Sequence, residues 1–228
     1  MPQLCELPTE LAQALAAKGP AIRRSLLRWP APPGRNDLPW RRPGRSPYEI
    51  LIAEALLKRT TATAAHRVYE DFIHAYPTPQ TLAESEEDDV VSLLTRVGLQ
   101  QQRARGLRSM ASALATLGEL PREKEALLQI PHVGAYAAAA VLSLGFGIPA
   151  AMVDSNVERV LSRLFAGAMV GQTRHTKQIP ALADALLPRA RHRDFNLKLV
   201  DLGAFICRYV HPRCAVCPIA GVCDSPRA

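Results

Sequence analysis

Apolar residues recur along this chain at spacings of three and four, and almost no stretch alternates polar with apolar positions. This period indicates amphipathic helices, because 3.6 residues complete one helical turn. Proline, glycine and short polar clusters separate the apolar stretches, as in "AYPTPQT" and "GELPRE". We therefore predict an all-α protein. Its expected helices span 8–28, 48–58, 62–75, 90–116, 124–130, 135–145, 153–165, 178–187 and 195–207.

The composition allows a substantial core and argues against two classes of protein. Hydrophobic residues make up 48% of the 228 residues, enough for one large domain or two small ones. No apolar run approaches the roughly 20 residues that a membrane-spanning helix needs. The N-terminus also lacks the basic and apolar segments of a signal peptide. We expect a cytoplasmic protein with no membrane partner.

The net charge of +7 is confined to the C-terminal third of the chain. Residues 159–228 carry 11 Lys or Arg against 4 Asp or Glu, while residues 1–158 carry 17 of each sign. Such an excess beside a cysteine cluster suggests a polyanionic partner. A generally soluble basic surface is the alternative interpretation.

Four of the five cysteines gather near the C-terminus, at Cys207, Cys214, Cys217 and Cys223. Clustered cysteines in a cytosolic protein hold a metal or cluster more often than they form disulfides. Four soft ligands suit an iron–sulfur cluster or a structural zinc. Zinc ribbons usually present two C-x2-C knuckles and this loop has one, which favours the cluster. Cys5 stands far away, and we expect it to be a bystander.

The x6, x2, x5 spacing of these cysteines resembles the four-iron cluster loop of the endonuclease III family of DNA glycosylases. "LLQIPHVGAYAAAAVLSLGFGIPAAMVDSNVERVLSRLF" is similar to that family's helix-hairpin-helix and the segment after it. "LPWRRPGRSPYEILIAEALLKRTTATAAHRVYEDF" is similar to its first core helices. The resemblance extends from about residue 20 to residue 224. Among subfamilies, the chain resembles the thymine/uracil G-mismatch glycosylases most.

The resemblance implies a two-lobed helix-hairpin-helix glycosylase fold. One lobe is a six-helix block at 38–150, with the hairpin at 124–145. The other lobe joins an N-terminal helix within 1–37 to C-terminal helices within 151–228, which end in a [4Fe-4S] loop at 207–223. The flipped base of the DNA is expected to lie between the two lobes.

The turn "PHVG" is expected to contact DNA, since turn amides and the start of a helix can hold a phosphate. Its predicted DNA contacts are His132, Val133 and Gly134. The family usually has glycine where His132 stands. We expect the histidine to fit only if its φ is negative or the hairpin adjusts.

Two residues of this region are predicted to be catalytic because of the resemblance. Asp154 matches the family's catalytic aspartate, whose carboxylate would stabilise positive charge on the sugar and orient water. The alternative is that Asp154 only caps the following helix. Tyr136 stands where endonuclease III has a lysine that forms a Schiff base with the sugar. A phenol cannot do so, which implies a monofunctional glycosylase. Alternatively, Tyr136 only fills a gap between helices.

Five further residues complete the predicted site. Glu54 shares the inward face of helix 48–58, which is costly for a carboxylate unless it is paired or functional. It is predicted to be catalytic, as in adenine glycosylases, or else structural. Arg59 would fill the hole left by the extruded base, and Gln101 would reach the orphaned base or lie in solvent. Arg208 and Arg213 would contact phosphates.

The leading interpretation is a monofunctional base-excision glycosylase that removes T or U opposite G from double-stranded DNA. We expect a monomer that associates with the nucleoid through DNA. One alternative is an adenine glycosylase acting on A opposite G or 8-oxoguanine, although such enzymes usually carry a further C-terminal domain. The others are an endonuclease III paralogue acting on oxidised pyrimidines and a catalytically silent DNA-binding protein.

Overall fold

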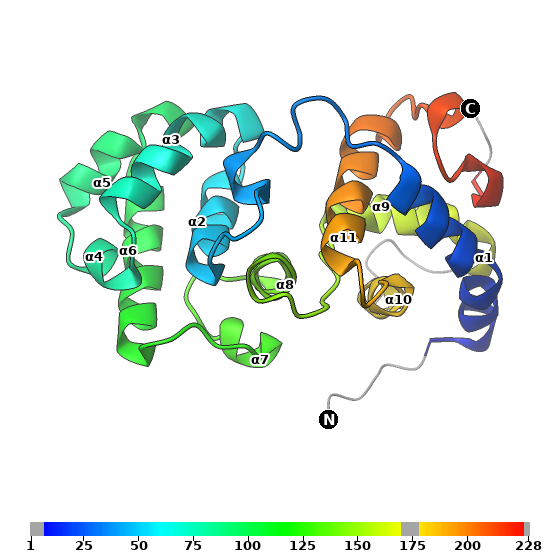
Figure 1. Ribbon diagram of the computed structural model, residues 1–228, viewed down its shortest axis with the longest axis horizontal. Helices are drawn as coiled ribbons and strands as arrows, with labels where there is room; N and C mark the ends of the chain where they lie inside the picture. Colours follow the sequence, from blue (N-terminus) through cyan, green and yellow to red (C-terminus); the bar gives the residue numbers. More distant parts are fainter. Residues whose placement is uncertain (1–6, 170–177, 226–228) are drawn as a thin grey trace. The chain divides into compact units, whose positions relative to one another are not determined.

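The computed structural model describes residues 7–169 and 178–225, and every regular element in these ranges is helical (Figure 1). The prediction of an all-α protein is confirmed. Cys5 lies outside the described residues. The chain divides into two compact units: one is Gly34–Ile148, and the other holds the described residues before and after it. Within the described ranges, no helix combines the length and the apolar character needed to cross a membrane.

The unit Gly34–Ile148 is built around α2, which is buried on several sides. α2 packs against α3, α6, α8 and the π-helical segment η3, and α4 and α5 cover α6. Its core includes Ile50, Leu51, Ile52, Tyr69 and Phe72. The bounds of the elements are α2 Pro47–Leu57, α3 Ala62–Ala75, α4 Pro79–Ala83, α5 Glu87–Leu93, α6 Gln100–Leu117, α7 Lys124–Leu127, α8 Ala135–Ala140 and η3 Val141–Phe146.

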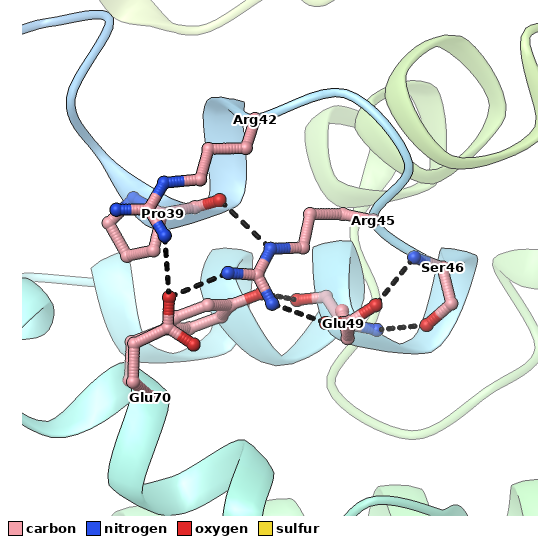
Figure 2. Close-up of polar contacts among 7 residues, drawn as sticks. Pro39, Arg42, Arg45, Ser46, Glu49 and Glu70 are labelled. Atoms are coloured by element: carbon pink, nitrogen blue, oxygen red, sulfur yellow. Dashed lines mark hydrogen bonds and ion pairs between the residues drawn. The ribbon is translucent and has the colours of Figure 1, made fainter.

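A polar cluster fixes the start of α2 (Figure 2). The Ser46 hydroxyl accepts from the Glu49 amide at 3.2 Å, and the Glu49 carboxylate accepts from the Ser46 amide at 2.7 Å, which completes a capping box. Arg45 donates to Glu49 and to Glu70 of α3, each at 2.6 Å, and to the Pro39 carbonyl at 3.0 Å. Burial alone would raise the pKa of Glu49, but hydrogen bonds from Ser46 and Arg45 lower it. The beginning of α2 is therefore held by the preceding segment and by α3.

The predicted helix 90–116 is wrong as a single element. α5 ends at Leu93 and α6 begins at Gln100, because Gly98 and Leu99 have φ of 68° and 52°. A right-handed helix cannot pass through such residues. The apolar residues of α5 and of α6 both recur at helical spacing, so periodicity alone does not show where one helix ends and the next begins.

The second unit joins the two ends of the chain. α1 packs against α10 and α11, and α9 packs against α10, α11 and η5. Leu11, Ile22, Leu161, Phe165 and Phe195 are among its buried residues. The bounds of the elements are α1 Thr9–Arg28, α9 Ser155–Leu164, η4 Ala166–Ala168, α10 Gln178–Leu186, α11 His192–Asp201, η5 Leu202–Ile206, η6 Cys214–Val216 and η7 Ala220–Val222.

Candidate active site and DNA-contact surface

Asp154 is the N-cap of α9, and both of its carboxylate oxygens are held. Oδ1 accepts from the Val157 amide at 2.8 Å, and Oδ2 accepts from the Asn156 side-chain amide at 2.9 Å. Asp154 therefore caps α9, which is compatible with a catalytic role, and that role stays a prediction. The side chain is half-buried, so the carboxylate is fixed in orientation and still partly accessible. A fixed carboxylate of this kind can stabilise a nearby positive charge without reorganising.

A run of hydrogen bonds connects Asp154 to the first cysteine of the C-terminal loop. Asn156 accepts from Arg159 at 2.9 Å, and Arg159 donates to the carbonyls of Gly203 at 2.7 Å and Cys207 at 2.8 Å. Gly203 has no room for a side chain, because a Cβ there would lie 2.7 Å from the Cβ of Asn156. The catalytic candidate and the cysteine loop are thus anchored to one another.

The four C-terminal cysteines lie near one another in a half-buried loop. Burial raises the pKa of the Cys217 and Cys223 thiols, and the neighbouring cysteines raise it further. Four thiolates would therefore be unfavourable here unless a bound cationic group neutralised them. Among the residues that the structure describes, no three His, Cys, Asp or Glu side chains are placed to hold a single metal ion.

Arg163 of α9 clamps the start of this loop. Its guanidinium donates to the Cys207 sulfur at 3.5 Å and to the carbonyls of Arg208 at 2.6 Å and Tyr209 at 3.0 Å. The Arg163 carbonyl accepts from the hydroxyl of Ser225 at 3.0 Å, beyond the last cysteine. α9 therefore carries Asp154 at its beginning and holds both ends of the cysteine loop near its end.

Glu54 and Tyr136 lie on neighbouring helices of the other unit. Glu54 is on α2 and Tyr136 is the second residue of α8, and these two helices pack together. Both side chains are half-buried and both have interaction partners. Asp154 belongs to the second unit. Their shared participation in one reaction remains a prediction.

A pocket of about 200 Å³ opens within the unit Gly34–Ile148, between the end of α2, the start of α6 and the hairpin turn. Its lining includes three cationic side chains and no acidic one. Three of the four non-glycine residues with left-handed backbone in the described chain line it: Arg59, Leu99 and His132, with φ of 54°, 52° and 66°. Strained residues of this kind cluster at functional sites. The lining residues are Ala55, Lys58, Arg59, Leu99, Gln102, Arg103, Gly106, Leu107 and His132.

Arg103 holds two of these strained turns together. Its N–H groups donate to the carbonyls of Ala55, Leu56, Lys58 and Gly98 and to the hydroxyl of Thr60. All five guanidinium N–H groups are thereby used. Burial lowers the pKa of Arg103, and the charge of Arg59 lowers it further. One side chain thus fixes the turn that carries Arg59 and the turn that carries Leu99.

The expectation that His132 needs a negative φ is wrong. Its φ is 66°, so it keeps the left-handed backbone that glycine usually supplies at this turn. The imidazole lies against Gly106, and the His132 carbonyl accepts from Lys58 Nζ at 2.7 Å. Val133 faces the protein in this structure, and its contact with DNA stays a prediction. The side chain is buried, and the amide donates to the Ile130 carbonyl at 3.1 Å.

Residues 52–189 match the family described as HhH-GPD superfamily base excision DNA repair protein. The chain belongs to this superfamily. It is 38% identical over 192 residues to a thymine/uracil-DNA glycosylase of Methanothermobacter thermautotrophicus, covering 83% of this chain and 86% of that protein. It is 35% identical over 217 residues to the human adenine DNA glycosylase, covering 90% of this chain and 39% of that protein.

The fold agrees with this membership. A solved structure of a thermostable thymine-DNA glycosylase superimposes with a TM-score of 0.82 at 34% identity, covering 93% of this chain and 96% of that one. The predicted helix-hairpin-helix glycosylase fold is confirmed, and so is the resemblance to thymine/uracil glycosylases.

The remaining predicted contacts of this HhH-GPD protein are accessible. Arg59, Gln101, Gly134, Arg208 and Arg213 are all exposed. Only Arg59 and His132 of the pocket lining were predicted from the sequence. The residues that were not predicted include Lys58, Arg103 and Leu99, which is 49% exposed. The signal for Leu99 was available in "VGLQQQ", where an apolar residue follows a glycine just before a helix.

Proposed function

We propose that this base excision DNA glycosylase removes thymine or uracil opposite guanine and leaves the DNA strand intact. The observation that carries the proposal is the fixed Asp154 carboxylate, in a chain that matches thymine/uracil-DNA glycosylases over most of their length. It would act as a monomer on double-stranded DNA at the nucleoid. The basic C-terminal third of the chain supports a polyanionic partner.

The proposed chemistry is hydrolysis of the N-glycosidic bond. The bond from C1′ to the base nitrogen breaks, the electron pair leaves with the base, and positive charge develops on the sugar. The Asp154 carboxylate stabilises that charge and orients water for attack at C1′, which yields a free base and an abasic site. We assign Tyr136 and Glu54 to the extruded base, where a phenol and a carboxyl group can hydrogen-bond to a pyrimidine. Tyr136 has no amine with which to form a Schiff base.

Two exposed side chains that line the pocket are proposed to occupy the space left by the extruded base. Arg59 is a long cation and Leu99 is an apolar wedge, and both are presented on left-handed turns. Inserted side chains of this kind offset part of the cost of unstacking. Gln101, on the first turn of α6, is proposed to contact the opposite strand. His132, Gly134, Arg208 and Arg213 would meet the DNA backbone; the packing of the His132 ring supports an indirect role for that residue.

We further propose that Cys207, Cys214, Cys217 and Cys223 hold a [4Fe-4S] cluster. Four neighbouring thiols in a half-buried loop fit such a group, because the irons supply the charge that four thiolates require. When bound, the cluster would hold the basic loop in shape. The loop's single C-x2-C pair supports a cluster over a zinc ribbon.

Anaerobically purified protein is expected to be brown and to contain about four iron and four sulfide per chain, in keeping with ligation by four cysteines. Iron and acid-labile sulfide assays, with the visible absorption spectrum, test this. Cys217→Ser should lower the iron content, whereas the matched change Ser225→Ala, just beyond the loop, should not. A colourless protein with one tightly bound zinc would contradict the cluster.

Single-turnover cleavage of matched duplexes tests the substrate. The duplexes carry G:T, G:U, A opposite 8-oxoguanine, or an oxidised pyrimidine, each with and without alkali. We expect strand breaks at G:T and G:U only after alkali, and no covalent product with borohydride. Breaks without alkali, or borohydride trapping, would show that another nucleophile replaces the missing lysine. Cleavage only at A opposite 8-oxoguanine would favour an adenine glycosylase. Glu54 supports that alternative, because it resembles the catalytic glutamate of that subfamily.

A further inference from the structure

The turn of the hairpin contains a residue whose backbone conformation is unfavourable for its type. His132 has a φ of 66°, a region in which a Cβ is crowded by the backbone. The residue is exposed, but its imidazole ring lies along α6. A Cβ added at Gly106 would lie 3.6 Å from each of three ring atoms, Cδ2, Cε1 and Nε2, which places the ring against the α6 backbone at Gly106.

Gly106 is itself locally unfavourable. It lies in the interior of α6, where glycine weakens a helix. A methyl group would fit at ordinary contact distance from the His132 ring, but a longer side chain would occupy the space of the ring. Position 106 therefore admits the imidazole only while its side chain is no larger than a methyl group. Lys58 completes the contact, because its ammonium donates to the His132 carbonyl at 2.7 Å.

We propose that His132 and Gly106 form a brace that positions the hairpin turn against α6 for DNA binding. This inference rests on the proposed function, because it takes double-stranded DNA to be the ligand of the hairpin. Two locally unfavourable residues meet at one contact, where a side chain longer than alanine at position 106 would displace the ring. The brace joins the hairpin turn to the pocket that carries Arg59 and Leu99, so that the backbone-binding turn and the inserted side chains move as one body. His132 acts here as a positioning residue.

The proposal predicts a compensating pair of substitutions. Gly106→Leu displaces the imidazole and weakens binding to a G:U duplex on the order of tenfold. His132→Gly removes the ring and also weakens binding. The double variant His132→Gly with Gly106→Leu binds at least threefold more tightly than Gly106→Leu alone, because the leucine fills the space vacated by the ring. Ser109→Leu, which adds the same side chain on the exposed face of α6, leaves binding unchanged.

Dissociation constants are measured by fluorescence anisotropy at a temperature where circular dichroism shows every variant folded. The salt dependence of binding separates positioning from direct contact. A positioning role leaves the slope of log K against log salt unchanged in His132→Gly, whereas loss of a phosphate contact lowers it by about one. The proposal is overturned if Gly106→Leu binds as the wild type does, if the double variant recovers less than threefold, or if the slope falls. All variants carry Asp154→Asn, which is expected to stop excision while affinity changes little, so a failure of the proposed substrate remains separate.

Discussion

Asp154→Asn is expected to lower the single-turnover rate of excision from a G:U duplex on the order of a thousandfold or more. The fold should be retained, because asparagine caps helices about as well as aspartate and its oxygen can still accept from the Val157 amide. A neutral amide cannot stabilise the positive charge on the sugar. Affinity for the duplex, measured by anisotropy, should change little.

Two control variants separate catalysis from capping. Asp154→Ala should lose excision and also about 1 kcal/mol of stability in urea denaturation, as expected when an N-cap is removed. Ser46→Ala removes the N-cap of α2 and should cost a similar amount of stability while excision continues. If Asp154→Asn retains excision within tenfold of the wild type, Asp154 is only a cap and the mechanism proposed here is wrong.

Arg103→Lys is expected to lower the free energy of unfolding by about 2–4 kcal/mol, because several charge-assisted hydrogen bonds to backbone carbonyls are lost together. Lysine keeps the charge but has three donors in place of a planar fork of five. The turns that carry Arg59 and Leu99 would lose their common anchor. Base extrusion, followed by 2-aminopurine fluorescence beside the mismatch, should therefore fall more than affinity for undamaged DNA.

Arg105→Lys provides the matched control on the same helix. Arg105 pairs with Glu87 at 2.9 Å, but its side chain is 71% exposed. An exposed ion pair contributes roughly 0–1 kcal/mol, so this variant should unfold at nearly the same urea concentration as the wild type. Equal effects of the two substitutions on stability and extrusion would show that the Arg103 contacts are not important in solution.

The helical class, the N-cap of α9 and the cysteine loop could be predicted from sequence, because each depends on residues close together in the chain. Apolar periodicity predicted the helical class, because apolar residues spaced three and four apart lie on the one face of a helix that is buried. The position of Asp154 before α9 was also readable, since capping involves only the next three residues. The spacing of four cysteines within 17 residues indicated a shared ligand group for the same reason.

Only the tertiary structure decided the features that depend on distant segments. The spacing of apolar residues before Gly98 and after Arg103 is that of a helix, and the backbone dihedrals of Gly98 and Leu99 place the break between α5 and α6. Arg103 reaches carbonyls more than 40 residues earlier in the chain, and spacing along α6 gives no hint of this. A left-handed backbone at His132 is unexpected for a residue with a Cβ. The contact that accommodates its ring is with Gly106, which lies 26 positions earlier in the chain, so no local pattern predicts it. Each residue type has its own backbone preference, which can be read from the sequence. Whether a residue such as His132 can keep an unfavourable backbone conformation depends on the tertiary contacts around it.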